Sequence, residues 1–160
     1  MAKRILVVGL GRFGSALAES LQQHGCEVMA VDINMDCVDA IKNKVTWAMQ
    51  LDAGDPIALR SIDAQTCTAA VVAIGEAFEP TALAVAALKE VGVPLIVARA
   101  TTPRHARILQ GVGAHRVVEL EAEMGRAVGR NLALEQDPAA AVAQNLAMGP
   151  PAVPPPGPPR

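Results

Sequence analysis

The chain reads Lys3-Arg4-Ile5-Leu6-Val7-Val8-Gly9-Leu10-Gly11-Arg12-Phe13-Gly14 near its start, and this stretch decides its fold. The apolar, β-branched residues 5–8 predict a buried parallel strand. Residues 15–21 follow the helical pattern directly after the glycines. A strand, a Gly-x-Gly-x-x-Gly turn and a helix in this order are typical of a dinucleotide-binding fold.

Each glycine of the turn has a physical role in such a fold. Gly9 makes the tight turn, Gly11 lets backbone N–H groups approach a pyrophosphate, and Gly14 lets the helix pack against the strand. The start of the helix then offers unpaired N–H groups and a partial positive charge to the phosphates.

An acid at the end of the next strand strengthens the interpretation. Residues 27–32 form a second apolar strand pattern that closes in Asp32, about twenty residues after the glycine turn. A carboxylate at this position accepts hydrogen bonds from a ribose and repels a 2′-phosphate. The sequence therefore predicts nucleotide binding, with NAD(H) or an adenosine ribose preferred over NADP(H).

Strand and helix patterns alternate along the rest of the chain. Further strands are predicted at 46–50, 69–75, 94–98 and 116–118, and helices at 34–42, 56–62, 80–91, 102–111 and 121–134. Such alternation predicts an α/β, Rossmann-type doubly wound fold with a six-stranded parallel sheet. We expect the strand order 3-2-1-4-5-6, with the ligand at the crevice where the order reverses.

Composition divides the chain into one domain and a tail. Residues 1–134 are predicted to be the nucleotide-binding domain, and residues 135–160 an Ala/Pro-rich tail in which seven of the last eleven residues are proline. Proline removes backbone donors, so the tail predicts disorder or polyproline II. Two alternatives stay open for it, a solvated end or a ligand for a proline-binding module, and residues 135–149 could extend the last helix.

Other features of the sequence narrow the function classes. A net charge of −2 does not favour nucleic acid, and the separated Cys26, Cys37 and Cys67 predict reduced thiols. No signal sequence or membrane segment is expected, which predicts a cytoplasmic protein. The chain lacks tyrosine, and its three histidines (His24, His105 and His115) are scattered, so a sensor is favoured over an enzyme.

Several separated motifs carry a resemblance over residues 3–134. They are Gly9-Leu-Gly-Arg-Phe-Gly14, Ala30-Val-Asp-Ile-Asn34, Val72-Ala-Ile-Gly75, Arg99-Ala100, Gly113-Ala-His-Arg-Val-Val118 and Glu121-Ala-Glu-Met-Gly125. With them the chain resembles RCK (TrkA-N) domains, most of all the cytosolic regulatory subunits of Ktr/Trk bacterial potassium transporters. The resemblance implies gating by bound ATP, ADP or NAD(H) without turnover. It also implies homodimers or rings assembled against a membrane-embedded potassium transport subunit.

The resemblance assigns roles to individual residues. Arg12 would reach a terminal phosphate, including that of a neighbour's nucleotide, Arg99 would face the phosphates, and Glu121 would help to bind a divalent cation (Mg²⁺ or Ca²⁺). Two plainer interpretations stay open, a solvated loop arginine for Arg12 and a helix-start acid for Glu121. The predicted cofactor-binding residues are Gly9, Gly11, Arg12, Phe13, Gly14, Asp32, Ile33, Asn34, Asp52, Ala53, Ile74, Gly75 and Arg99.

The sequence also departs from the family pattern and leaves alternatives open. Leu120 stands where a proline is usual, and we expect the tail in place of the family's C-terminal lobe. A small NAD-dependent oxidoreductase would need Glu76 or Glu79 as its acid or base, and an NAD(H) redox sensor with a non-potassium output also fits. The alanine-rich helix segments 81–88 and 127–134 are expected either to form a dimer face or to pack on the sheet.

Overall fold

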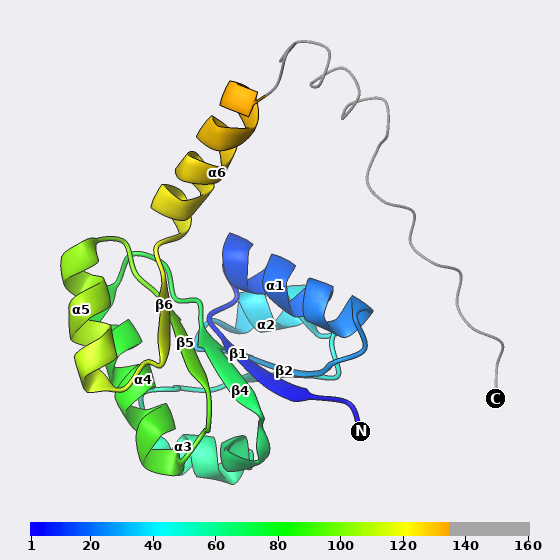
Figure 1. The fold of residues 1–160 in the computed structure, drawn as a ribbon. Helices are drawn as coiled ribbons and strands as arrows, with labels where there is room; N and C mark the ends of the chain where they lie inside the picture. Colours follow the sequence, from blue (N-terminus) through cyan, green and yellow to red (C-terminus); the bar gives the residue numbers. More distant parts are fainter. Residues whose placement is uncertain (135–160) are drawn as a thin grey trace, which may run out of the picture. The chain divides into compact units, whose positions relative to one another are not determined.

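The computed structural model describes residues 1–134 and shows six parallel strands in the order β3-β2-β1-β4-β5-β6 (Figure 1). The strands are β1 (Arg4–Val8), β2 (Glu27–Asp32), β3 (Trp47–Gln50), β4 (Ala69–Val72), β5 (Ile96–Arg99) and β6 (Arg116–Val118). The predicted fold class and strand order are therefore confirmed.

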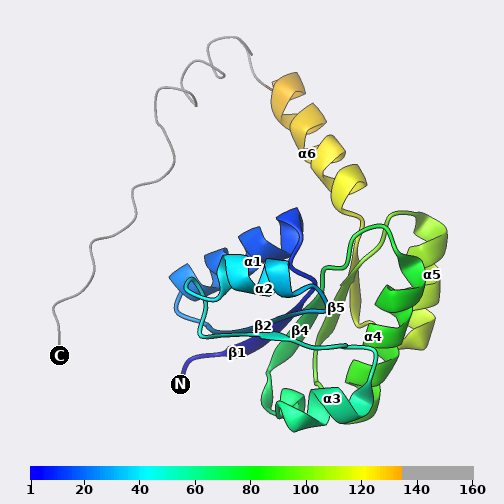
Figure 2. The same ribbon diagram turned by 180° about the vertical axis from the view of Figure 1, so that it is seen from behind.

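Helices cover both faces of the sheet (Figures 1 and 2). One apolar core lies under α1 (Arg12–Gln23) and α2 (Met35–Ile41). The other lies under α3 (Pro56–Ser61), the 3₁₀ helix η1 (Ala64–Thr66), α4 (Phe78–Val91) and α5 (Pro103–Val112). A sixth helix, α6 (Leu120–Leu134), follows β6.

The alternation of side chains along β1 explains the two cores. Leu6 and Val8 point into the core under α4, whereas Val7 points into the core under α1 and α2. All three are at most 3% exposed. A strand that is apolar on both faces fits only between two layers of helices, which is why the run at residues 5–8 predicts a central strand.

Polar residues start three of the helices in the way that the sequence suggests. The side chains of Asn34, Asp55 and Thr102 accept hydrogen bonds from backbone N–H groups two or three residues further on, at the starts of α2, α3 and α5. Pro56 and Pro103 occupy the first turns of their helices. A proline is tolerated there because its missing N–H would have no partner within the helix.

Several element boundaries differ from the prediction. The fourth strand ends at Val72 rather than at residue 75, so residues 73–75 form a loop at the edge of the sheet. The fifth begins at Ile96 rather than at Pro94 and extends to Arg99. Helix α4 begins at Phe78 and includes Pro80, because the first turn of a helix needs no donor from the proline nitrogen.

The inner face of α4 is part of the core. Its buried residues are Thr81, Ala84, Val85, Ala87 and Leu88. These five residues of segment 81–88 therefore pack in the core, as one of the two expectations has it, whereas Leu83 of the same segment is exposed and the expected dimer face stays a prediction. Segment 127–134 belongs to α6, whose described residues are not buried in this chain.

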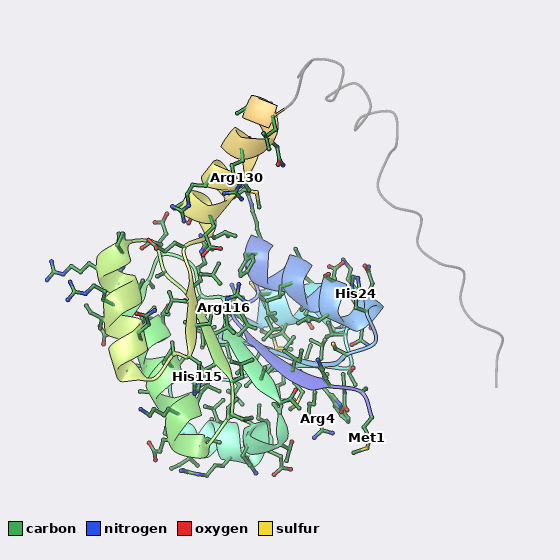
Figure 3. All side chains as sticks on the ribbon, in the orientation of Figure 1. Met1, Arg4, His24, His115, Arg116 and Arg130 are labelled. Carbon is green, nitrogen blue, oxygen red and sulfur yellow. The ribbon has the colours of Figure 1, made fainter. Side chains whose placement is uncertain are left out.

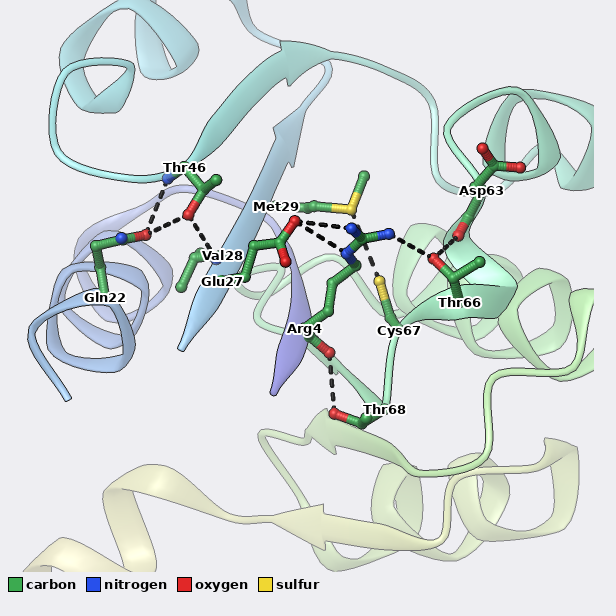
Figure 4. A network of polar contacts seen from close by, with 10 residues as sticks. All are labelled: Arg4, Gln22, Glu27, Val28, Met29, Thr46, Asp63, Thr66, Cys67 and Thr68. Carbon is green, nitrogen blue, oxygen red and sulfur yellow. Dashed lines mark hydrogen bonds and ion pairs between the residues drawn. The ribbon is translucent and has the colours of Figure 1, made fainter. Parts of the chain in front are cut away.

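A polar network holds the sheet together at the amino ends of the strands (Figure 4). Arg4 forms an ion pair with Glu27 at 2.8 Å between Nη2 and Oε1 and donates from Nη1 to Thr66 Oγ1 at 2.9 Å. The Cys67 thiol lies 3.7 Å from the sulfur of Met29. This network joins β1, β2 and the η1 segment at the edge opposite the carboxyl ends of the strands, so we assign it a structural role.

The chain divides into two units, Met1–Glu121 and a second unit that begins at Ala122 and whose described part is residues 122–134. The predicted single domain of residues 1–134 therefore stays a prediction. The predicted tail, residues 135–160, lies outside the described residues. No helix of the described part is long and apolar enough to cross a membrane.

Candidate nucleotide-binding site

A cleft of about 740 Å³ opens at the carboxyl ends of β1 and β4, where the strand order reverses. This is the place at which open α/β sheets bind ligands, and the volume is that of a small-molecule site. The structure brings together nine predicted residues in its lining: Gly9, Gly11, Asp32, Ile33, Asn34, Asp52, Ala53, Ile74 and Gly75.

The three glycines of the turn have separable roles. Gly9 has a φ of +92°, and a Cβ there would lie 2.8 Å from the backbone nitrogen of Ile74. A Cβ at Gly14 would overlap the carbonyl oxygen of Gly9. A Cβ at Gly11, by contrast, would meet no atom within 4 Å, although Gly11 lines the cleft. Gly9 and Gly14 are thus required by the fold, whereas Gly11 leaves room for a ligand.

Asp32 ties the glycine turn to the second strand. Its Oδ2 accepts a hydrogen bond from the backbone N–H of Leu10 at 2.7 Å, and its Oδ1 accepts one from the N–H of Asn34 at 2.8 Å. Each carboxylate oxygen has two lone pairs, so both can still accept from ribose hydroxyls. Asp32 therefore shapes the backbone of the turn as well as facing the cleft.

The far half of the cleft has apolar walls. Leu51 follows β3, and Leu83 is an exposed leucine of α4. Asp52 also lines the cleft, and its Oδ1 accepts from the N–H of Gly54 at 2.9 Å. Such a slot suits a flat base next to a ribose held at Asp32.

Sequence reasoning missed several lining residues, among them Leu10, Cys37, Leu51, Gly54 and Leu83. Leu10 and Gly54 stand beside predicted site residues, so proximity was a usable signal. Cys37 and Leu83 lie on helices, where no local pattern marks a residue that faces a cleft. The pKa of the Cys37 thiol is raised by burial and by the nearby carboxylates of Asp32 and Asp36, which keeps the thiol protonated.

A second hollow of about 520 Å³ adjoins the cleft and shares Gly11, Ala73 and Gly75 with it. It contains the predicted residues Arg12, Phe13 and Arg99. Of the residues that the structure describes, the cleft is lined by acids and no basic side chain, and the hollow by two arginines and no acid. This separation of charge matches a ribose in the cleft and phosphates in the hollow.

The two arginines differ in their partners. Arg12 is exposed and forms no ion pair within residues 1–134. Arg99 is 15% exposed, and its Nη2 lies 2.5 Å from Oε1 of Glu121, whose side chain is 65% exposed. The Nε of Arg99 is buried and has no partner in the described structure.

The contact with Arg99 bears on the expected role of Glu121. Its pKa is lowered first by a hydrogen bond from its own backbone N–H and next by the Arg99 guanidinium. Among the described residues, no group of three or more His, Cys, Asp or Glu side chains could hold a metal ion. Glu121 as a cation ligand therefore stays a prediction, and the partner that the structure gives it is an arginine.

None of the three histidines lines the cleft or the hollow. His24 follows α1, with its Nδ1 2.7 Å from the carbonyl oxygen of Ser20. His105 stacks on Phe78 with ring centroids 4.3 Å apart, and His115 Nδ1 accepts from the N–H of Ile96 at 3.0 Å. Figure 3 shows the labelled His24 and His115 well apart on the molecule. The structure thus gives these side chains structural contacts.

The family model of the TrkA-N domain matches residues 5–120. Ktr system potassium uptake protein C of Bacillus subtilis (strain 168) is 33% identical over 132 residues, which cover 82% of this chain and 60% of that protein. Protein A of the same system and organism is 34% identical over 133 residues, which cover 83% and 60%. The chain thus spans about 60% of the length of these relatives.

Solved structures show the same fold. The TrkA-N domain of inner membrane protein ybaL from Escherichia coli has a TM-score of 0.73 at 22% identity, covering 82% of this chain and 98% of that one. The GsuK channel bound to NAD has a TM-score of 0.66 at 19% identity, covering 81% and 23%. The Kef CTD of Shewanella denitrificans in its AMP-bound form has a TM-score of 0.65 at 20% identity, covering 89% and 87%.

Proposed function

The chain belongs to the TrkA-N domain family, and from that premise we propose that it is a nucleotide-sensing regulatory component of a potassium transport system. In this proposal it works in the cytoplasm and controls a membrane-embedded transport subunit as a homodimer or a ring. The relatives named as Ktr potassium uptake proteins support this output. Because the chain spans about 60% of their length, the partner and the assembly are part of the proposal.

The observation that carries the proposal is the division of the site into two parts. The glycine turn, Asp32 and the apolar slot suit an adenosine, whereas Arg12 and Arg99 in the adjoining hollow suit phosphates. Because ATP, ADP and NAD(H) all carry an adenosine followed by phosphates, we propose that they bind the site in the same orientation. Solved relatives of this fold with bound NAD or AMP support the ligand class.

The proposed mechanism is a shift between two arrangements of the protein without turnover of the ligand. A nucleotide can move that equilibrium only as far as its affinities for the two arrangements differ, typically by about 1–3 kcal/mol. Because ATP, ADP and NAD(H) carry different groups beyond the first phosphate, they would contact the hollow differently. Arg12 and Arg99 in the hollow are thus proposed to decide which nucleotide activates the transport subunit.

Ligand-dependent stability is the test of the site. We would measure the unfolding temperature with ATP, ADP, AMP, NAD⁺, NADH and NADPH, each with and without Mg²⁺. Saturation at a hundredfold excess over Kd stabilises the folded state by about 2.7 kcal/mol, a shift of several degrees. Arg12→Ala should weaken the binding of ATP or ADP. The control Arg107→Ala, on α5 outside both the cleft and the hollow, should leave their binding unchanged.

The output needs a separate measurement in cells. Potassium uptake at low external potassium should fall when the gene is deleted and return with the wild-type chain but not with Arg12→Ala. A lack of stabilisation by any nucleotide at millimolar concentration would refute the sensing role. Oxidation of NADH by the purified protein with a small-molecule substrate would instead support the oxidoreductase alternative, in which Glu79 lines the cleft.

A further inference from the structure

The starting observation is that Arg99 already holds an anion from the same chain. Its guanidinium is mostly buried and lines the hollow, and Nη2 contacts Oε1 of Glu121 at 2.5 Å. The two residues are 22 positions apart, on the last residue of β5 and in the first turn of α6. The carboxylate thus takes up one donor, Nη2, of an arginine whose side chain lines the hollow.

The pairing leaves the arginine only partly satisfied. A guanidinium has five N–H donors in a planar fork, and the buried Nε–H of Arg99 has no acceptor in the described structure. A buried donor without a partner is costly, so Arg99 favours a ligand with more acceptor oxygens. A terminal phosphate has three such oxygens and can bind the fork in a bidentate manner.

Glu121, in contrast, can leave Arg99 at small cost. Its side chain is 65% exposed, and exposed ion pairs contribute little because water screens them. Leu120, the residue before it, lines the hollow, so a ligand that fills the hollow also contacts the start of α6.

From these contacts we propose that Glu121 is an internal competitor for the phosphate position at Arg99. When the hollow is empty, Glu121 holds Arg99 and thereby anchors the first turn of α6. A nucleoside di- or triphosphate whose terminal phosphate reaches Arg99 displaces the carboxylate and releases that turn. The inference rests on the proposed function, because it requires that nucleotide phosphates enter the hollow, and it names the contact through which their presence reaches α6.

The first test measures affinity by calorimetry with AMP, ADP and ATP in EDTA, which removes any contribution of a divalent cation. Glu121→Gln should bind ADP or ATP about two- to fivefold more tightly than the wild type, because the competing charge is gone. AMP, whose single phosphate stays near the glycine turn, should be unchanged. In an Arg99→Gln background, Glu121→Gln should bring no gain.

Glu90→Gln is the matched control, since it makes the same change in another exposed Arg–Glu pair. Glu90 Oε1 lies 3.3 Å from Arg60 Nη2, and Glu90 lines neither the cleft nor the hollow. Its substitution should therefore leave the affinities for AMP, ADP and ATP unchanged. If Glu121→Gln and the wild type bind ADP and ATP with equal affinity, the proposal that Glu121 competes with the phosphate is refuted. Weaker binding by Glu121→Gln would also overturn it, because Glu121 would then assist the ligand.

The second test follows the start of α6 by hydrogen exchange of the backbone amides at residues 120–128. ATP should speed exchange there in the wild type, and Glu121→Gln should show the faster exchange without any nucleotide. Wild-type binding of ATP with no change in exchange would overturn the release step and leave nucleotide sensing intact. Failure of every nucleotide to bind either protein would refute the proposed function itself.

Discussion

Two glycines of the turn should respond in opposite ways to the same substitution. Gly11→Ala is expected to spare the fold and to impair nucleotide binding, because a Cβ at Gly11 meets no protein atom within 4 Å and Gly11 lines the hollow proposed for phosphates. Gly14→Ala is expected to impair the fold itself. There the Cβ would overlap the carbonyl oxygen of Gly9 and lie 3.3 Å from the Cβ of Ala73.

The magnitudes follow from these contacts. Gly11 precedes α1 and has a φ of −72°, which alanine also adopts. The only cost to the fold is that alanine is a poorer residue than glycine at the start of a helix, at about 0.5–1 kcal/mol. At Gly14 the obstacle is backbone, and overpacking of this kind costs about 1–3 kcal/mol or more. A loss of about 2 kcal/mol corresponds to a fall of about 6–10 °C in a domain of this size.

The assay is a pair of measurements on each variant, denaturant unfolding for stability and calorimetry for the nucleotide that stabilises the wild type most. Gly11→Ala should lose at least about tenfold in affinity, or about 1.4 kcal/mol. Gly111→Ala in α5, where a Cβ also meets open space, is the control and should change neither affinity nor the fold adversely. Wild-type affinity in Gly11→Ala would refute the reasoning, because the phosphates would then not pass over Gly11.

Two further predictions concern stability. Asp32→Asn should lower the free energy of unfolding by about 1–2 kcal/mol, because one amide oxygen cannot accept from the N–H groups of both Leu10 and Asn34. Unchanged denaturant unfolding would show that the turn does not depend on these bonds. Burial raises the pKa of the Cys67 thiol from 9.0 to about 11, so the unfolded chain loses the thiol proton at a lower pH than the folded protein does. The free energy of unfolding should therefore fall by about 2–3 kcal/mol as the pH rises between these two values. Unfolding measured across this range should show a smaller decline in Cys67→Ala, and an equal decline would contradict the assignment.

The sequence was a good guide wherever the signal is local. Residues 5–8 are apolar on both faces, which fits only a central strand, and the structure places them in β1 between two cores. Asn34 and Asp55 predicted helix starts because their short side chains reach the backbone N–H two residues on. Local patterns were less reliable at strand ends, where pairing with a neighbour, and not the apolar character of residues 73–75, decided that β4 stops at Val72.

The sequence by itself determined the α/β fold, the strand order and the family, because alternating strands and helices after a glycine turn of this spacing are typical of one fold with this strand order. It also indicated nine residues of the cleft, since the glycine turn and the strand ends meet at one edge of any sheet with this order. Only the tertiary structure decided which of these residues the fold needs and which it leaves for a ligand, as at Gly14 and Gly11. It alone paired Arg99 with Glu121, because a contact between side chains 22 positions apart depends on how β5 and the start of α6 meet in space.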